Sequence, residues 1–285
     1  MNIAVLLTCF NRKQKTCECL SSFIKVTKKY SECNFDIYLV DDHSIDGTAE
    51  MIKEAFPSVN LISGNGSLFW AGGMRLAWMT ALDRPLLYDG FLLVNDDVCF
   101  VENFWDIICE TNKYAESHYG MQGIYTLSTA DKDTGNISYG GHCLRKKLFK
   151  HSYYQVCPSD LPQECELTNA NILFVSSNVV ESIGILDTHY THFLADFDYS
   201  LVAKKKGFPV LVSPGIGGYC KNDHSEDPLS PDLLIKKRIR NLYGIKGLAL
   251  NEYLYYLRKH FYFKAPYAFV VLWLRTLFPK IIPEK

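Results

Sequence analysis

The sequence predicts an α/β fold in which a doubly wound, mostly parallel central sheet is flanked by helices. Runs of consecutive apolar residues recur along residues 1–105, as expected of strands that are covered on both faces. Helix-like segments separate these runs, which is the pattern of repeated βαβ units. No GxGxxG pattern follows the first run, which argues against a Rossmann oxidoreductase.

Each element of this first part follows from a local signal. The strands are apolar and bounded by polar turns, the first helix places Leu20, Phe23 and Ile24 on one face, and either Asp46 or Thr48 caps the second helix. In chain order, the expected elements are the strand 3–8, the helix 14–29, the strand 35–40, the helix 48–55, the strand 60–64, the helix 72–82 and a strand that starts at Phe91.

The alternation weakens after about residue 106, where turn signals become more frequent. The elements expected there are a hairpin turn at DKDTGNISYGG, a strand and a short helix within 170–187 that ends near Gly184, a helix after Asp196 that Gly207 closes, and the strand 208–214 before a loop over GIGGYCKNDHSEDP. We therefore divide the chain into a first half of one domain (1–105), a second half of the same domain (106–225) and a helical C-terminal extension (226–285).

The composition is that of an ordinary globular protein. The 285 residues are 48% hydrophobic and 21% charged, and 30 basic residues oppose 31 acidic ones, so no net charge favours nucleic acid as a partner. The ten cysteines show no CxxC pair and no zinc spacing, and the N-terminus lacks the features of a signal peptide. We expect reduced thiols in a cytoplasmic protein.

The end of the chain has a different character. No run of about 18 apolar residues predicts a spanning helix, but residues 266–282 are rich in aromatic and aliphatic side chains, and the basic run KKRIR (236–240) lies upstream. Such a segment can lie in a membrane interface, here the inner face of the plasma membrane, or it can be a helix packed on the protein. Both alternatives remain open, as does a homodimer.

Polar residues stand at the ends of three predicted strands. Because parallel strands end at one edge of a sheet, where ligands bind in such folds, we expect these residues to surround a ligand and a cation. They are Thr8, Asn11 and Arg12 after the first strand, Asp41 and Asp42 after the second, and Asn95, Asp96 and Asp97 after the fourth.

Two arginines and two glycines suit a phosphate group. The guanidinium groups of Arg12 and Arg75 match phosphate geometry, and Gly72 and Gly73 would let backbone N–H groups approach a diphosphate at the start of a helix. Tight helix packing is the alternative for the glycines.

Four pieces in this order resemble the family-2 glycosyltransferases of the GT-A fold, over roughly residues 2–225. They are LLTCFNR, VDDHSIDGT, LVNDDV and FLADFDYSLVAKKKGF, and the further piece GNGSLFWAGGMRLA is similar to a subgroup of rhamnosyltransferase-like enzymes of surface polysaccharide synthesis. The resemblance implies a GT-A (Rossmann-like) fold and a hexosyltransferase that uses a nucleotide sugar.

The resemblance also implies roles for the acidic residues of the first half. Asp41 and Asp42 match carboxylates that bind the base and ribose of a nucleotide, and Asn95, Asp96 and Asp97 match a metal-binding motif with Asn in place of its first Asp. Asp97 would be the ligand of Mg²⁺ or Mn²⁺, and Asp96 or Asn95 would contact the ribose or a metal-bound water. Helix capping without a metal is the alternative.

Late in the chain, Asp196 matches the family's catalytic base, and Asp198 would support or orient it. Ala195 replaces the Glu that usually precedes this base, and Asp196 as a helix N-cap is the alternative reading.

His224 matches the position of an additional metal ligand, with Asp223 and His192 as weaker rivals. Together these residues predict an inverting transferase that moves a sugar from a UDP- or dTDP-sugar to a hydroxyl of a lipid-linked saccharide. The alternatives are a sugar-phosphate nucleotidyltransferase, against which the glycine-free turn CFNRK argues, and a non-catalytic sugar-nucleotide or glycan-binding module.

Overall fold

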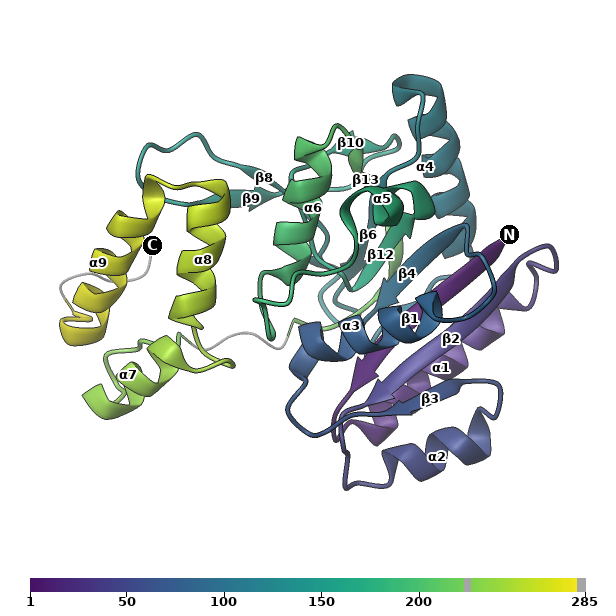
Figure 1. The fold of residues 1–285 in the computed structure, drawn as a ribbon, viewed down its shortest axis with the longest axis horizontal. Coiled ribbons are helices and arrows are strands. Elements are labelled where there is room, and N and C mark those ends of the chain that lie inside the picture. Colours follow the sequence, from purple (N-terminus) through teal and green to yellow (C-terminus); the bar gives the residue numbers. More distant parts are fainter. Residues whose placement is uncertain (223–226, 281–285) are drawn as a thin grey trace.

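The computed structural model describes residues 1–222 and 227–280, and a mixed β-sheet runs through its centre (Figure 1). In the described part of the chain, ten strands form this sheet in the order β10-β13-β6-β12-β4-β1-β2-β3, with β5 paired to β13 and β7 paired to β6. A second, three-stranded sheet has the order β11-β8-β9.

The elements alternate strictly at first and less regularly later. The strands are β1 (Asn2–Cys9), β2 (Asn34–Asp41), β3 (Asn60–Ser63), β4 (Gly90–Val94), β5 (Cys99–Phe100), β6 (Ile124–Ala130), β7 (Ile137–Tyr139), β8 (Gly141–Leu144), β9 (Tyr153–Gln155), β10 (Gln163–Glu164), β11 (Leu167–Thr168), β12 (Ile172–Ser176) and β13 (Val210–Tyr219). The helices are α1 (Lys13–Thr27), α2 (Thr48–Ala55), α3 (Phe69–Leu82), α4 (Phe104–Tyr119), α5 (Ser177–Ile183), α6 (Ala195–Lys205), α7 (Ile235–Tyr243), α8 (Leu250–His260) and α9 (Lys264–Leu277).

The first half confirms the predicted parallel arrangement. Strand β1 pairs in parallel with both β2 and β4, and β2 pairs in parallel with β3. The second half is mixed, because β12 runs antiparallel to its two neighbours, β4 and β6. The predicted hairpin is also present, since β6 and β7 pair in antiparallel register with Thr129 opposite Tyr139.

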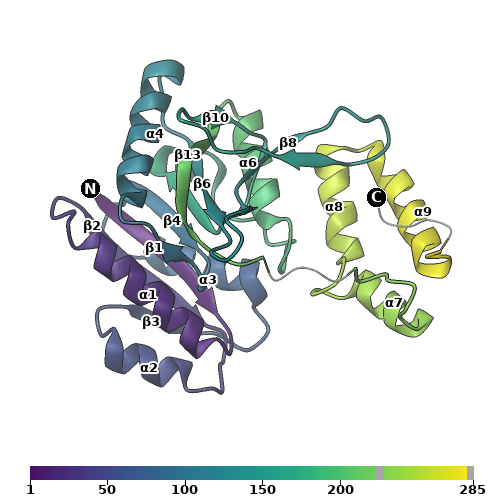
Figure 2. The same cartoon turned by 180° about the vertical axis from the view of Figure 1, so that it is seen from behind.

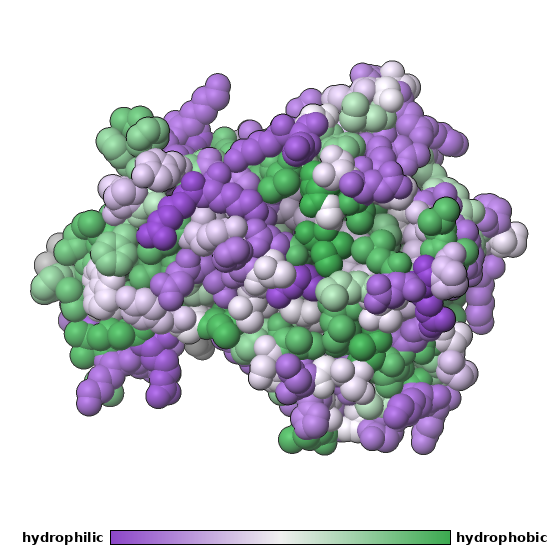
Figure 3. Space-filling view, viewed as in Figure 1, coloured by the Kyte–Doolittle hydropathy of each residue, from purple (hydrophilic) through white to green (hydrophobic). Residues whose placement is uncertain are grey.

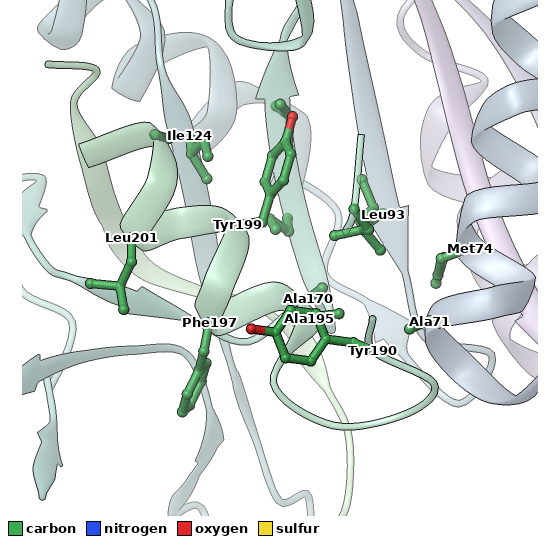
Figure 4. Packing of buried hydrophobic residues seen from close by; sticks show 14 of the residues in the cluster. Ala71, Met74, Leu93, Ile124, Ala170, Tyr190, Ala195, Phe197, Tyr199 and Leu201 are labelled. Atoms are coloured by element: carbon green, nitrogen blue, oxygen red, sulfur yellow. The ribbon is translucent and has the colours of Figure 1, made fainter. Parts of the chain in front are cut away.

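Helices cover both faces of the sheet, as the unbroken apolar strands require. Ile3 and Val5 of β1 belong to the core with α1, α2 and α4, whereas Ala4 and Leu6 belong to the core with α3, α5 and α6. Successive side chains of a strand point to opposite faces, so one apolar run serves two cores. Figure 4 shows the second core, in which side chains of α3 and α6 gather around the sheet.

One predicted boundary was wrong. The segment GIGGY, expected to be a loop, continues strand β13 to Tyr219 and pairs with β6 and β5. The glycines are what this pairing needs, because a Cβ at Gly217 would lie 2.5 Å from Leu127 and a Cβ at Gly218 would lie 2.7 Å from the carbonyl oxygen of Cys99. Close backbone approach, rather than a turn, explains these glycines.

The C-terminal helices α7, α8 and α9 lie together beside the sheet domain, and both views place the β8–β9 loop next to α8 and α9 (Figures 1 and 2). Helix α8 packs onto the domain through Leu250, Leu254 and Leu257, which belong to the core of α3 and α6. Among the described residues, no helix combines the length and the apolar character needed to cross a membrane.

Candidate active site

The polar residues predicted at the strand ends come together around a cavity of about 490 Å³, which we call the donor cavity. Its lining includes six of the predicted residues, contributed by the ends of β1 and β4 and by the loops after β1 and β2. They are Thr8, Arg12, Asp42, Asn95, Asp96 and Asp97. The convergence expected from parallel strand ends is therefore present.

The guanidinium group of Arg12 bridges the two adjacent carboxylates of this cavity. Nη1 donates to Oδ1 of Asp96 at 2.9 Å, and Nη2 donates to Oδ2 of Asp97 at 2.6 Å. Lys15 adds a weaker positive charge, with Nζ 3.9 Å from Asp97. The chain itself thus offsets much of the repulsion between the two carboxylates.

Burial acts most strongly on Asp96. Its side chain is almost fully buried, and this desolvation raises the pKa of Asp96 to about 7, although the positive charge of Arg12 opposes the shift. Asp97 lies nearer to solvent, and its Oδ1 accepts a hydrogen bond from the Cys220 thiol at 3.3 Å. Asp97 is therefore the more accessible carboxylate of the pair.

The carboxylates of Asp96 and Asp97 fit a hard divalent cation only if a bound molecule and water supply further oxygen ligands. Within residues 1–222 and 227–280, no group of three or more His, Cys, Asp or Glu residues could hold a metal ion. His224 and its rival Asp223 lie outside the described residues. Mg²⁺ and similar ions commonly bind through one or two carboxylates together with substrate phosphates and water. Asp96 and Asp97 match that arrangement.

Asn95, which replaces the first Asp of the motif, is held by an indole. Nε1 of Trp70 donates to Oδ1 of Asn95 at 2.8 Å. An amide oxygen accepts this bond without adding a third negative charge beside Asp96 and Asp97. No pattern in the sequence indicates this contact, because Trp70 lies on α3, far from Asn95 along the chain.

Asp41 and Asp42 are buried and hold backbone groups. The Asp42 carboxylate accepts N–H groups from Gly66 at 2.8 Å, Leu68 at 2.9 Å and Phe69 at 3.2 Å, and so shapes the turn into α3. Oδ1 of Asp41 accepts the N–H of Ser44 at 3.1 Å. Asp42 also lines the donor cavity, whereas Asp41 is not part of its lining.

The glycines and Arg75 have structural contacts instead of the expected place at a phosphate. A Cβ at Gly73 would lie 2.1 Å from Oγ1 of Thr8, and one at Gly72 would lie 3.3 Å from Cβ of Leu68, which favours the packing alternative. Nη1 of Arg75 donates to the carbonyl oxygens of Asp187 at 3.0 Å and Tyr190 at 2.8 Å. Arg75 therefore holds the loop before α6 and lines neither cavity.

Asn11 joins two loops at the rim. Its Oδ1 accepts the N–H of Ile45 at 2.8 Å, and its own N–H donates to Oγ of Ser44 at 2.8 Å. Asn11 has a positive φ of 52°. The φ angles of His43, Phe69 and Leu194, which lie near the two cavities, are also positive, at 65°, 52° and 68°. Strained backbone of this kind clusters at functional sites.

Asp196 lies in a second, larger cavity of about 1130 Å³, which we call the acceptor cavity. Its carboxylate accepts the N–H groups of Phe197 at 2.9 Å and Ala170 at 3.2 Å, and burial raises the pKa of Asp196 to about 6. Helix α6 begins at Ala195 with Leu194 as its N-cap, so the N-cap alternative for Asp196 was wrong. A carboxylate with this pKa is mostly ionised at neutral pH and can accept a proton.

The described contacts of Asp198 are with residues other than Asp196. It is buried, and its carboxylate accepts bonds from the Tyr190 hydroxyl at 2.9 Å, Nζ of Lys259 at 2.8 Å and Nε2 of His260 at 2.7 Å. Asp198 therefore anchors α8 to α6. Its described hydrogen bonds and ion pairs do not include Asp196, so the structure gives no contact through which it would orient the base.

The two cavities adjoin. Six residues line both of them, and these are Trp70, Asn95, Tyr139, Asn171, His192 and Phe193. His192 therefore lies at the junction of the two cavities. Its role as a metal ligand stays a prediction. A molecule in the donor cavity and another in the acceptor cavity would meet at this shared border.

Comparison with known families and structures bears on the fold and on the first part of the chain. Residues 4–105, which hold the donor cavity's acidic pair, match the family described as Glycosyl transferase family 2. No curated protein sequence matches the chain.

Solved structures with the same fold include three proteins of low sequence identity to this chain. PcManGT, a mannosyltransferase from Pyrobaculum calidifontis in complex with GDP-Man and Mn²⁺, has a TM-score of 0.55 and 11% identity over 90% of this chain and 63% of that one. S. aureus TarS 1–349 in complex with UDP has a TM-score of 0.55 and 14% identity, over 97% of this chain and 79% of that one. GalNAc-T7 with UDP, GalNAc and Mn²⁺ has a TM-score of 0.57 and 13% identity, over 85% of this chain and 47% of that one. The chain thus spans less than two thirds of the first and third of these.

Proposed function

We propose that this chain is an inverting glycosyltransferase of family 2 that uses a nucleotide-sugar donor. It would move a sugar from a UDP- or dTDP-sugar to a hydroxyl of a lipid-linked saccharide, as rhamnosyltransferase-like enzymes do in surface polysaccharide synthesis. One observation carries the proposal: a cavity with an acidic pair and a basic clamp adjoins a second cavity that holds a half-buried carboxylate.

The donor cavity supplies groups for a nucleotide diphosphate. Asp42 lines it and could accept from a base or a ribose hydroxyl, with Asp41 behind it. Arg12 offers guanidinium N–H groups that suit phosphate oxygens. The neighbours PcManGT, TarS and GalNAc-T7, in complex with GDP-Man, UDP, or UDP and GalNAc, support a nucleotide as the ligand of this fold.

A divalent cation fits the same cavity. Asp97 would hold Mg²⁺ or Mn²⁺, with Asp96 beside it, and the bound ion would offset the charge that develops on the departing diphosphate. Two of the neighbours contain Mn²⁺, which supports this assignment. Arg12 already bridges the two carboxylates, so a cation would compete with its guanidinium group for them.

The acceptor cavity supplies the base. Asp196 would take the proton of the acceptor hydroxyl as its oxygen attacks the anomeric carbon from the face opposite the diphosphate. The C–O bond to the acceptor forms as the bond to the diphosphate breaks, so the anomeric configuration inverts. This displacement requires no covalent intermediate on the enzyme.

The walls of the acceptor cavity suit a saccharide with an apolar portion. Tyr153, Tyr253 and Tyr267 present aromatic faces on which sugar rings can pack, and Val271 and Leu272 of α9 add an aliphatic wall. The volume of about 1130 Å³ exceeds the usual range of small-molecule sites, which favours an acceptor of more than one sugar.

Nucleotide release tests the proposal. The purified chain is incubated with a panel of UDP- and dTDP-sugars and lipid-linked saccharide acceptors, with Mn²⁺ or with EDTA. We expect acceptor-dependent nucleotide release that requires Mn²⁺ and falls sharply in Asp196→Asn. Nucleotide binding without turnover, unchanged in Asp196→Asn, would instead identify a non-catalytic module, and formation of a sugar nucleotide from a sugar phosphate would identify a nucleotidyltransferase.

A further inference from the structure

Helix α9 is apolar around most of its circumference although it lies at the edge of the molecule (Figure 1). On one side, Ala268, Val271 and Leu272 line the acceptor cavity. On the other side large apolar residues remain exposed, namely Phe269, Val270, Leu274, Leu277 and Phe278. A helix that is apolar on both sides normally has a covering on both sides.

The turn that leads into α9 is even more exposed. Tyr262 is 70% exposed and Phe263 is 82% exposed, and both lie between α8 and α9. These two consecutive aromatic side chains bury little of their apolar area within the chain. Their exposure indicates a partner surface outside it.

A second segment, far away in the sequence, continues this surface. The loop between β8 and β9 reads RKKLFK at 145–150, and its apolar tip consists of Leu148, 78% exposed, and Phe149, 54% exposed. The ring of Phe149 lies 6.0 Å from that of Tyr267 on α9, and both views place this loop beside the C-terminal helices (Figures 1 and 2).

Positive charge is concentrated at the same end of the molecule. Residues 233–280 contain ten Lys and Arg residues but a single acidic residue, Glu252, and the loop 145–150 contains four basic residues and no acidic one. Because the whole chain carries 30 basic and 31 acidic residues, the remainder is strongly acidic. Figure 3 shows hydrophobic surface interleaved with hydrophilic side chains at this end.

We propose that the docking face, defined as the loop 145–150, the turn at Tyr262 and Phe263, and the exposed side of α9, binds a lipid bilayer with anionic headgroups. Aromatic and aliphatic tips flanked by lysines are the chemistry of interfacial anchoring, in which apolar groups enter the headgroup region and cations pair with anionic lipids. The acidic remainder of the chain would be repelled, so this charge asymmetry also sets the orientation. The inference goes beyond the proposed function and does not require it.

Docking would also position the acceptor cavity. Helix α9 lines this cavity on one side and belongs to the docking face on the other, so the cavity would lie next to the lipid surface. A hydroxyl on a lipid-linked saccharide could then reach Asp196 without leaving the bilayer. A water-soluble acceptor would gain nothing from this arrangement.

Vesicle co-sedimentation of the full chain tests the proposal. We expect binding to vesicles of phosphatidylcholine with phosphatidylglycerol, and little binding to phosphatidylcholine alone. Lys146→Gln with Lys147→Gln should weaken binding roughly 25-fold, at about fivefold per charge, and Phe263→Ser should weaken it about tenfold. Leu87→Ser, at a side chain 88% exposed before β4, is the matched control and should bind as the parent chain does.

Three results would overturn the proposal. The first is no binding to anionic vesicles, and the second is binding that neither the Lys146 and Lys147 pair nor Phe263→Ser weakens. The third is a concentration-dependent dimer that Phe263→Ser abolishes, which would assign the face to a second copy of the chain. Since sedimentation does not depend on turnover, a chain that binds vesicles but transfers no sugar would refute only the proposed function.

Discussion

Replacement of Arg12 by glutamine tests the idea that the guanidinium group and a divalent cation compete for one pair of carboxylates. In the structure Arg12 reaches Asp96 at 2.9 Å and Asp97 at 2.6 Å, and its own side chain is 35% exposed. Breaking a fully buried ion pair costs about 3–5 kcal/mol, and an exposed pair contributes about 0–1 kcal/mol. The partial exposure of Arg12 places the expected loss of unfolding free energy between these limits, at about 2 kcal/mol.

This loss should appear as a fall in Tm of about 4–8 °C in EDTA, from the usual scaling for a domain of this size. Mn²⁺ should then raise the Tm of Arg12→Gln by more than it raises that of the parent chain, because the cation no longer displaces a guanidinium group. Binding at a concentration about 100 times Kd would restore about 2.7 kcal/mol. Lys15→Gln is the control, since the side chain of Lys15 is 46% exposed and its Nζ lies 3.9 Å from Oδ2 of Asp97.

Thermal unfolding followed by circular dichroism, in EDTA, in Mn²⁺ and in Mn²⁺ with UDP, gives all of these values. The reasoning would be refuted if Mn²⁺ stabilised Arg12→Gln less than the parent chain, or if neither protein responded to Mn²⁺ with UDP present. An unchanged Tm in EDTA would show that the clamp does not stabilise the acidic pair.

Three further predictions follow from the site. Asp196→Asn should lower kcat by about 10²–10⁴-fold with unchanged nucleotide affinity. Asp198→Asn should instead lower the Tm, because it weakens the acceptor that Tyr190, Lys259 and His260 share, and should keep most of kcat at low temperature. Equal kinetic losses would contradict this division. The kcat/KM of the parent chain should rise with pH around a midpoint near 6, because the raised pKa of Asp196 keeps the base protonated below it, and a flat profile between pH 5 and 7 would exclude Asp196 as the base. Gly73→Ala should destabilise the fold by about 1–3 kcal/mol in denaturant unfolding, because its Cβ would overlap Thr8, and Gly72→Ala, which has more room, should cost less.

Local pattern alone predicted much of the first half. Unbroken apolar runs give the strands β1, β2 and β4, because strands covered on both faces need apolar side chains in both directions. Parallel pairing then brings the strand ends to one edge, so the meeting of Thr8, Arg12 and Asp97 could be expected before their contacts were known. The hairpin β6–β7 likewise follows from its turn residues.

Other features depend on contacts between distant segments and leave little trace in the sequence. A glycine-rich run is compatible with a turn or with close strand pairing, and only the pairing with β6 and β5 shows that GIGGY belongs to β13. Two aspartates two residues apart in the sequence look equivalent, yet Asp196 faces a cavity and Asp198 faces Lys259 and His260 of α8.

The sequence by itself therefore determined the fold class and the chemistry available at the sheet edge, because periodicity and strand-end residues are local properties. The tertiary structure decided which charged groups meet. It placed Arg12 between Asp96 and Asp97, and it brought the loop 145–150 beside α9, where two short segments form one surface. The physical reason is that the strength of a pairing depends on distance and burial in space, which residues separated by a hundred positions acquire only when the chain folds.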